Sequence, residues 1–404
     1  MMNKKARDFP LYPNEVTNDF LSMCFGESVI SFELDTSMTA GGVLADAFRV
    51  FNIKYDTDNE LPKSCFVKCT KEIPEVVELC LATQVYAKEV YFYSTLIKKV
   101  KDVIRVPECY GIFKDENDEE CKEFCLVLED FDQENWMPFD QFDNPMDFED
   151  TSMLMRDLGS FHAACWHEPV SNEPGLGPYK AHWQSLNDSF WDDEGTAWDQ
   201  VLPKWKEVYG EELLSLVDSE VEETILKINE IYISDNGKAI QESLIEELQK
   251  RPRTITHGDA RGNNICKSND GNTIGIIDWQ MWAAGPASNE FSQLWFNSYS
   301  LESGMIHRLE ELTKVYYTSL TDSNPDIKAS YPFDLLMEDT KLIFINMWIQ
   351  YVGFTLGSIE GYKDPEQEKS KANWREMMKR NMETVHYSGS LEAFKKFISS
   401  KGLD

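Results

Sequence analysis

The chain has 404 residues, 42% of them hydrophobic and 12% aromatic, a composition that excludes a wholly disordered protein and suits one large domain or two lobes. Its formal net charge of −32 at pH 7 argues against a nucleic-acid partner, because neutralising a phosphate backbone needs clustered lysine and arginine. Such an acidic surface suits cationic small-molecule substrates, and solubility alone explains it equally well.

The N-terminal segment and the cysteines indicate where the protein resides. Residues 1–28 predict an N-terminal extension whose charges precede no apolar segment, unlike a secretory signal. The nine cysteines show no CxxC pair and no metal-ligand spacing, which is typical of reduced thiols. The longest apolar stretch, residues 342–359, contains Asn346 and Gln350, which favours a buried helix over a membrane span. We therefore expect a cytoplasmic protein without a membrane span.

The first third of the chain predicts a small sheet crossed by one helix. Stretches rich in β-branched and aromatic residues between polar turns predict strands, and apolar positions at helical spacing predict one long helix. In chain order we expect strands at 29–36 and 43–56 around the turn SMTAGG, a strand at 64–70, a helix at 75–99, and a strand pair in RVPECYGIFKD and KEFCLVLEDF.

The character of the chain changes after Phe131. An acidic loop at 132–150 is followed by a predicted helix, TSMLMRDLGSFHAACW, and then by largely helical sequence. We therefore expect an α+β fold with a small β-rich N-lobe at 29–131 and a large, mainly helical C-lobe at 132–404. The segment 170–250, rich in tryptophan and acidic residues, is where we expect substrate specificity to arise.

Residues 256–280, THGDARGNNICKSNDGNTIGIIDWQ, interrupt the helical region. NICKS and TIGIIDW predict two short strands joined by the turn NDGN, whose residue types tolerate positive φ. The loop before the first strand and the residue that ends the second strand lie at the same end of such a hairpin. We therefore expect Asp259, Asn264 and Asp278 to converge within a few ångströms.

These three side chains suit phosphoryl transfer. A carboxylate and an amide oxygen, with open positions for water and phosphate, fit Mg²⁺, a hard octahedral ion that prefers oxygen ligands. The remaining aspartate, Asp259, would then accept a proton from an attacking hydroxyl or orient it. In such reactions positioning and electrostatics supply most of the catalysis.

The pattern HGDxxxxN followed by IDW resembles the aminoglycoside phosphotransferase and choline kinase group, and within it the CHK-kinase-like, or ecdysteroid-kinase-like, family. Supporting pieces come in the expected order: a strand lysine in FVKCT, a helical glutamate in KEVYFYSTL, the lobe-connecting LVLEDF, and LGSFHAACW before the catalytic loop. The resemblance covers roughly residues 29–300. It implies a two-lobed, protein-kinase-like fold that holds ATP in its cleft.

The resemblance also implies roles for the hairpin residues. Asp259 would be the catalytic base, and Asn264 and Asp278 would be the Mg²⁺ ligands. His257 would brace the loop by hydrogen bonding rather than carry a proton.

For the nucleotide, the resemblance implies that Lys68 contacts the α- and β-phosphates and is held by an ion pair with Glu89. Backbone groups around Glu129 and Phe131 would hold the adenine edge. The turn that contains Gly41 and Gly42 would cover the phosphates.

Structural alternatives stand beside these roles. Lys68 could be an exposed lysine of an edge strand, although a buried charge in an apolar strand would need a partner. A solvated helix face explains Glu75 and Glu78, which share the predicted helix with Glu89. The turn SMTAGG lacks a GxGxxG pattern, so a plain hairpin turn explains it nearly as well.

Two positions depart from the pattern of the family. Glu290 stands where an aspartate that braces the catalytic loop is usual, and its extra methylene should be tolerable. Arg261 stands where an aromatic or small residue is more familiar. Our hypothesis is that its guanidinium neutralises the γ-phosphate or binds an anionic substrate group, and the alternative is a salt bridge to a nearby carboxylate.

We expect an ATP- and Mg²⁺-dependent O-phosphotransferase that acts on a small-molecule alcohol, with cationic alcohols among the candidates. Aromatic residues of the C-lobe, among them Trp282, Trp295 and Trp348, suit a cage for a cationic amine, although core packing is their commoner explanation. The alternative is a catalytically inactive, nucleotide-binding pseudokinase or scaffold. A protein kinase is disfavoured, because no DFG-to-APE activation segment follows Asp278.

Overall fold

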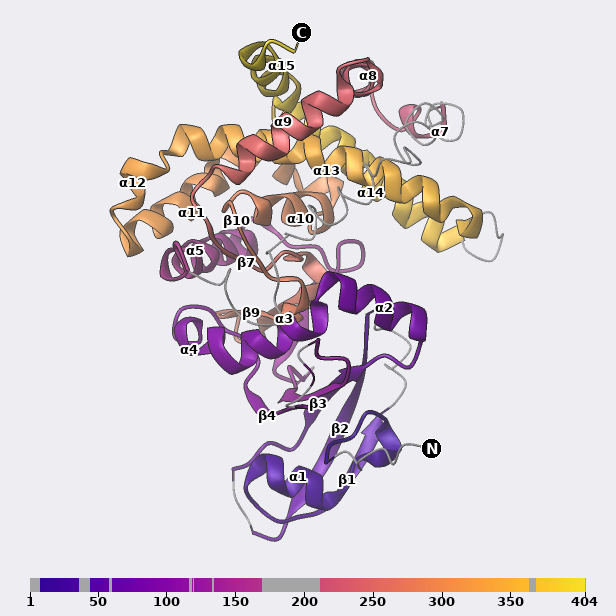
Figure 1. The fold of residues 1–404 in the computed structure, drawn as a ribbon, viewed down its shortest axis with the longest axis vertical. Coiled ribbons are helices and arrows are strands. Elements are labelled where there is room, and N and C mark those ends of the chain that lie inside the picture. The colour runs from indigo at the N-terminus through magenta and orange to yellow at the C-terminus, as the bar shows by residue number, and fades with distance from the viewer. Residues whose placement is uncertain are drawn as a thin grey trace. The chain divides into compact units, whose positions relative to one another are not determined.

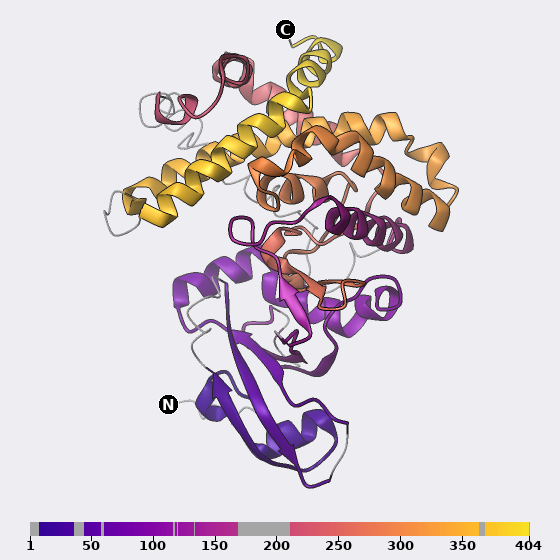
Figure 2. The same cartoon turned by 180° about the vertical axis from the view of Figure 1, so that it is seen from behind.

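The structure, a computed structural model, describes residues 8–35, 44–57, 60–115, 118, 120–132, 134–168, 211–362 and 368–403. These residues form two compact units. The first comprises the described residues up to 137 together with Ser268–Met281, and the second comprises 138–168, 211–267 and 282–403. Figures 1 and 2 show the chain from two opposite sides, and each unit is taken by itself below.

The first unit is built on a five-stranded antiparallel sheet with the strand order β1-β2-β3-β5-β4 (Figure 1). Its strands are β1 (Val29–Asp35), β2 (Ala45–Tyr55), β3 (Cys65–Thr70), β4 (Cys109–Lys114) and β5 (Phe124–Glu129). Side chains of a strand alternate between the two faces of a sheet. In β3, which is the central strand, Cys65, Val67 and Cys69 are fully buried on one face, and Lys68 therefore projects from the other.

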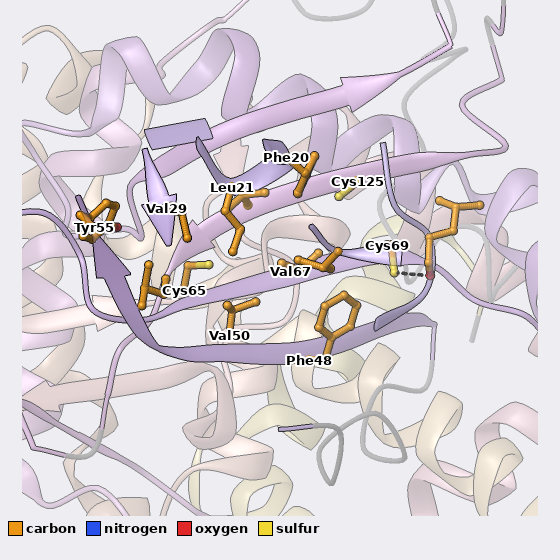
Figure 3. Close-up of a cluster of buried hydrophobic side chains, with 14 residues drawn as sticks. Phe20, Leu21, Val29, Phe48, Val50, Tyr55, Cys65, Val67, Cys69 and Cys125 are labelled. Atoms are coloured by element: carbon orange, nitrogen blue, oxygen red, sulfur yellow. Dashed lines mark hydrogen bonds between the residues drawn. The ribbon is translucent and has the colours of Figure 1, made fainter. Parts of the chain in front are cut away.

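One face of this sheet carries the hydrophobic core of the first unit (Figure 3). Helix α1 (Asn18–Phe25) contributes Phe20 and Leu21 to the core, where they join Phe48 and Val67 of the sheet. The helix begins where the Thr17 hydroxyl accepts a hydrogen bond from the Phe20 N–H, a capping arrangement that satisfies one unpaired donor of the first turn. The segment expected to be an extension therefore contributes to the packed core.

The helix expected at 75–99 is a series of shorter pieces. They are α2 (Pro74–Thr83), α3 (Val85–Tyr91), the π-helical turn η3 (Phe92–Leu96) and α4 (Ile97–Val100). The break falls at Gln84, whose backbone is left-handed with φ +60°. Left-handed backbone ends a helix, so α2 stops before Gln84. Glu89 is buried on α3, whereas Glu75 and Glu78 on α2 are exposed.

The second unit is mainly helical. Its elements are α5 (Phe148–Ala164), α7 (Glu211–Leu214), α8 (Ser219–Ile233), α9 (Gly237–Gln249), β7 (Thr254–Thr256), η5 (Gly262–Asn264), β10 (Ala283–Gly285), α10 (Asn289–Asn297), η7 (Leu301–Ser303), η8 (Met305–Arg308), α11 (Leu309–Ser323), α12 (Ile327–Ser330), α13 (Phe333–Tyr362), α14 (Glu368–Tyr387) and α15 (Ser390–Lys401). Strands β7 and β10 pair antiparallel, and residues 257–282 lie between them in the sequence. Helix α13 packs against α14 and α15 (Figure 2).

The stretch 342–359 lies within α13, and its described apolar side chains from Leu342 to Val352 are buried, as expected for a core helix. Among the described residues, no helix has the length and apolar character that crossing a membrane requires.

The predicted hairpin is present. Strands β8 (Ile265–Ser268) and β9 (Ile274–Ile276) are joined by a turn in which the Gly271 N–H donates to the Ser268 carbonyl at 2.8 Å. Gly271 has φ +78°, a conformation that glycine adopts without steric cost. The short elements η1 (Pro13–Glu15), β6 (Trp136–Pro138) and η6 (Trp279–Met281) complete the described fold.

The predicted α+β class is confirmed: a β-rich first unit precedes a mainly helical second unit, as in protein-kinase-like folds. The bounds of the N-terminal extension and of the two lobes stay a prediction. The turn with Gly41 and Gly42, and most of the segment 170–250, lie outside the described residues.

Gly159 provides a test of the second unit. A methyl group at this position of α5 would lie 2.5 Å from the Tyr316 carbonyl oxygen of α11, too close for any real contact. Replacing glycine by alanine normally stabilises a helix by about 1 kcal/mol. We expect the reverse for Gly159→Ala, a loss of about 1–3 kcal/mol measured by urea unfolding, because two helix backbones must separate.

The control is Glu230→Ala on the exposed face of α8, expected to change stability by less than about 0.5 kcal/mol. Equal stability of Gly159→Ala and the wild type would contradict the close helix contact.

Candidate active site

The lysine of the central strand binds two carboxylates of the first unit. Lys68 Nζ lies 2.8 Å from the Glu89 carboxylate on α3 and 2.6 Å from Asp278 Oδ1, just after β9. The Lys68 side chain is 13% exposed and comes from the middle of five strands, so the exposed edge-strand alternative is excluded. The structure therefore brings together three residues that the sequence placed 21 and 210 positions apart.

The charges of this triad depend on one another. Burial by itself lowers the pKa of Lys68, but the charges of Asp278 and Glu89 outweigh it, so the pKa of Lys68 is raised and the ammonium stays protonated. Burial raises the pKa of Glu89 to about 7, against the opposing effect of Lys68. One cation thus faces two carboxylates, and the triad carries an excess of negative charge when all three groups are ionised.

Asp278 is held in an uncommon backbone conformation. Its φ of +64° is left-handed, a region that few residue types other than glycine, asparagine and aspartate occupy. Gln280 Nε2 donates to Asp278 Oδ2 at 3.1 Å, and the next residue, Trp279, stacks on Phe92 with ring centroids 4.0 Å apart and an interplanar angle of 8°. Phe92 begins the π-helical turn η3, three residues after Glu89. The helix that carries Glu89 is therefore joined to the Asp278 turn both by charge and by ring stacking.

The segment expected to hold adenine is bound within the first unit. The Glu129 N–H donates to the Glu108 carbonyl at 2.8 Å, and the Glu129 side chain forms an ion pair with Arg105. The Phe131 ring stacks on Trp136, with centroids 4.2 Å apart. Nucleotide contacts of Glu129 and Phe131 stay a prediction.

The second unit holds the loop that carries the other predicted residues. Asn264 Nδ2 donates to both the main-chain oxygen and the Oδ2 atom of Asp259, each at 2.9 Å. Since both amide protons of Asn264 point at Asp259, its carboxamide oxygen points elsewhere and presents an acceptor. The Asp259 N–H donates to His257 Nδ1 at 3.2 Å, which confirms the bracing hydrogen bond expected of that histidine.

A buried carboxylate braces this loop from behind. Glu290 of α10 is fully buried, and it accepts hydrogen bonds from the backbone N–H of His257 at 2.6 Å and of Gly258 at 3.2 Å. The longer side chain thus makes the contacts expected of an aspartate at this position. Gly258 has φ +81°, so the loop reverses at a residue that tolerates this backbone.

Sequence reasoning missed the residue that orients Glu290. His162 of α5 lies with Nε2 3.4 Å from Glu290 Oε2 and with Nδ1 2.7 Å from the Tyr316 hydroxyl of α11. A histidine among the apolar residues of LGSFHAACW was the available signal, but its partners lie 128 and 154 residues further along the chain. The loop is therefore held through three helices.

These partners set the charge of Glu290. Burial would raise its pKa, but the hydrogen bond from His162 and the backbone N–H of His257 more than offset this, so the pKa of Glu290 is lowered. The buried carboxylate therefore stays ionised and accepts from both backbone donors at neutral pH.

Arg261 lies beside Asp259. Its Nε atom is 3.4 Å from Asp259 Oδ1, and its side chain is 43% exposed. The salt bridge that we considered as an alternative is therefore present, with Asp259 itself as the partner. A contact with phosphate or substrate stays a prediction.

The structure thus assembles the predicted residues in two groups. Lys68, Glu89 and Asp278 meet in the first unit, and Asp259 and Asn264 meet in the second, so the convergence of Asp278 with the other two stays a prediction. Among the residues that the structure describes, no group of three or more His, Cys, Asp or Glu side chains is arranged to hold a metal ion. The predicted Mg²⁺ ligands, Asp278 and Asn264, are one carboxylate and one carboxamide, so they do not form a group of that kind.

Comparison of the sequence with protein families places the chain. Residues 46–329, about 70% of the chain, match the model of the ecdysteroid kinase-like family. The chain belongs to this family, as the motifs indicated, and membership indicates small-molecule kinase or phosphotransferase activity. No curated protein matches the chain in sequence.

Several solved structures are similar in fold. Choline kinase from Cryptosporidium parvum is 14% identical with a TM-score of 0.43, over 96% of this chain and 93% of that one. An aminoglycoside phosphotransferase from Alicyclobacillus acidocaldarius is 12% identical with a TM-score of 0.43, over 97% and 96%. Plasmodium vivax ethanolamine kinase is 12% identical with a TM-score of 0.39, over 91% and 84%. The family assignment does not depend on these similarities.

The brace predicts a defined pH dependence. A carboxylate whose pKa is lowered in the folded state stabilises the protein above its unfolded pKa of 4.5, and this contribution is lost as the pH falls through the folded pKa. Glu290→Gln should therefore unfold more readily than the wild type by about 2–4 kcal/mol at pH 7, because its amide donors oppose two backbone donors. Urea unfolding should show this difference shrinking below about pH 4.5.

Glu290→Asp is the matched control, since it keeps the carboxylate and shortens its reach. It should lose less stability than Glu290→Gln and keep the pH dependence of the wild type. A stability difference that does not change with pH would refute the ionised brace.

Proposed function

We propose that the protein is an ATP- and Mg²⁺-dependent small-molecule kinase that transfers the γ-phosphoryl group to an alcohol. The observation that carries this proposal is the triad in which Lys68 pairs with both Glu89 and Asp278. Burying the Lys68 ammonium, which is 13% exposed, together with two carboxylates costs desolvation free energy. A role in binding phosphate would explain why the chain keeps such a cluster. The braced loop with Asp259 and Asn264 supplies the remaining chemistry.

The oxygen atoms present suit Mg²⁺. Asp278 supplies a carboxylate, and the hydrogen bonds of Asn264 Nδ2 leave its carboxamide oxygen as an acceptor. When held by Asp278 and Asn264, Mg²⁺ would supply positive charge that neutralises the phosphates. The excess negative charge of the triad would attract a cation to Asp278, while Lys68 would bind the α- and β-phosphates.

Asp259 is the proposed general base. The alcohol oxygen would form a bond to the γ-phosphorus, its proton would pass to the Asp259 carboxylate, and ADP would leave with the electrons of the broken P–O bond. Asn264 fixes the orientation of the carboxylate through its hydrogen bond to Oδ2, and Arg261 opposes the charge on Oδ1. Glu290 and His162 position the loop without touching the reacting atoms.

The adenine would be held by backbone groups around Glu129 and Phe131, and the turn with Gly41 and Gly42 would cover the phosphates. A cytoplasmic location, where ATP is available and thiols stay reduced, fits this activity and the nine cysteines.

A pseudokinase is the second candidate. The observation that favours it is the direct contact of Lys68 with Asp278, because each group would have to turn toward phosphate or metal before the reaction. Against it stand Asp259 and Asn264, which a chain that only binds nucleotide does not need. Mg²⁺-dependent ATP binding without turnover of any alcohol would identify a pseudokinase.

Thermal unfolding with and without Mg·ATP tests the nucleotide site. A ligand at a hundred times its dissociation constant stabilises the folded state by about 2.7 kcal/mol, which should raise the Tm by a few degrees. We expect this rise for the wild type only when magnesium is present, and we expect Asp278→Asn to abolish it. A wild type that ATP does not stabilise, with or without the metal, would refute the proposal.

Asp259→Asn separates binding from chemistry. It should keep the Tm rise with Mg·ATP and lose ADP release on every alcohol that the wild type uses.

Arg261 is tested by turnover. If its guanidinium neutralises the γ-phosphate or binds an anionic substrate group, Arg261→Ala should lower kcat/KM for ADP release at least tenfold. An unchanged rate would show that the arginine serves only as a salt-bridge partner of Asp259.

A further inference from the structure

The π-helical turn η3 carries a buried hydroxyl group near the triad of Lys68, Glu89 and Asp278. Tyr93 follows Glu89 by four residues, a spacing at which two side chains lie on the same face of a helix. Its ring meets that of Phe92 edge-on, with centroids 5.2 Å apart, and Tyr93 is 3% exposed. The hydroxyl lies close enough to Glu89 and Asp278 for their charges to act on it.

Packing of the ring does not account for this hydroxyl. It has no hydrogen-bond partner among the residues that the structure describes. Burial raises the pKa of Tyr93, and the charge of Glu89 adds to this effect, so the hydroxyl keeps its proton at neutral pH. A buried donor without an acceptor destabilises the folded state, and a phenylalanine would fill the same space without that cost.

Glu89 carries the matching acceptor. Lys68 Nζ donates to Glu89 Oε1 at 2.8 Å, whereas Oε2, equally close to the same nitrogen, accepts no hydrogen bond from the described residues. The other two carboxylates whose charges act on Tyr93, those of Asp278 and Glu129, already accept a hydrogen bond at each oxygen. Among these three carboxylates, the oxygen that still needs a donor is therefore Glu89 Oε2.

The need for that donor grows when the site is used as we propose. In the present state the Lys68 ammonium pairs with both Glu89 and Asp278. During the proposed reaction Asp278 would turn toward Mg²⁺ and Lys68 toward phosphate oxygens, so Glu89 would keep a smaller share of the ammonium. Glu89 is 1% exposed, and a buried carboxylate that loses part of its cation needs another donor.

We propose that Tyr93 is a positioning residue of the nucleotide site, whose hydroxyl donates to Glu89 Oε2 when Mg·ATP is bound and so holds the carboxylate against Lys68. This inference rests on the proposed kinase function. The hydroxyl lacks an acceptor in the nucleotide-free state and gains one in the bound state, so it favours the bound state by the difference between the two.

Tyr93→Phe keeps the ring and removes the hydroxyl. Without nucleotide, the urea midpoint of this variant should equal or exceed that of the wild type, because a buried donor without an acceptor is lost. The dissociation constant for Mg·ATP, obtained from the Tm rise over a range of concentrations, should increase at least tenfold, or about 1.4 kcal/mol. For an alcohol that the wild type phosphorylates, KM for ATP should rise while kcat stays within twofold.

Tyr55→Phe is the matched control. The Tyr55 hydroxyl of β2 donates to the Pro62 carbonyl at 2.7 Å, in the core of the same unit. This variant should show the opposite pattern, a lower urea midpoint and an unchanged dissociation constant for Mg·ATP. Glu89→Ala removes the proposed acceptor, so adding Tyr93→Phe to it should change that constant less than twofold.

The outcomes separate this inference from the function on which it rests. A wild type that Mg·ATP does not stabilise refutes the kinase function itself. Given that stabilisation, an unchanged dissociation constant in Tyr93→Phe, a urea midpoint below that of the wild type, or a tenfold effect that persists in Glu89→Ala would each overturn the inference alone. The contrast between the two tyrosine variants decides the question even if Glu89→Ala does not fold.

Discussion

The first unit depends on the need to compensate one buried positive charge. Lys68 projects from the centre of the sheet, and an ammonium group in that position is tolerated only with well-placed carboxylates. Glu89 reaches it from α3, which begins after the break at Gln84. Asp278 reaches it because a left-handed residue turns the chain after β9. The helix break, the stacked rings of Phe92 and Trp279 and the left-handed aspartate are thus parts of one arrangement.

The second unit contains a buried negative charge that also needs compensating partners. There a buried carboxylate, Glu290, is compensated by two backbone N–H groups and by His162, and the loop that carries Asp259 is held by those contacts. The strength of this brace comes from its burial, because hydrogen bonds to an ionised group strengthen as water is excluded. The contacts that hold this loop therefore extend over three helices.

The sequence predicted the elements that local chemistry determines. Alternating strands and the turn around Gly271 followed from spacing and residue type, whereas the pairing of Lys68 with Glu89 was implied by the family resemblance. It did not predict the break at Gln84, because glutamine has no intrinsic preference for left-handed backbone. Nor did it predict that His162 meets Glu290 or that Asn297 meets Tyr351, because these partners are far apart in the chain and nothing in the local pattern links them. Tertiary packing decides such contacts, and a single sequence does not record it.

The left-handed backbone of Asp278 limits how this site changes during evolution. Only glycine, asparagine and aspartate enter that conformation readily, so most single replacements would both remove the carboxylate and disturb the turn that carries Trp279. A replacement of Asp278 that removes the carboxylate and keeps the turn would therefore be limited to asparagine or glycine. Among relatives, an asparagine here would mark a lineage that gave up catalysis and kept its fold, whereas a bulky or β-branched residue would mark one whose turn had been rebuilt.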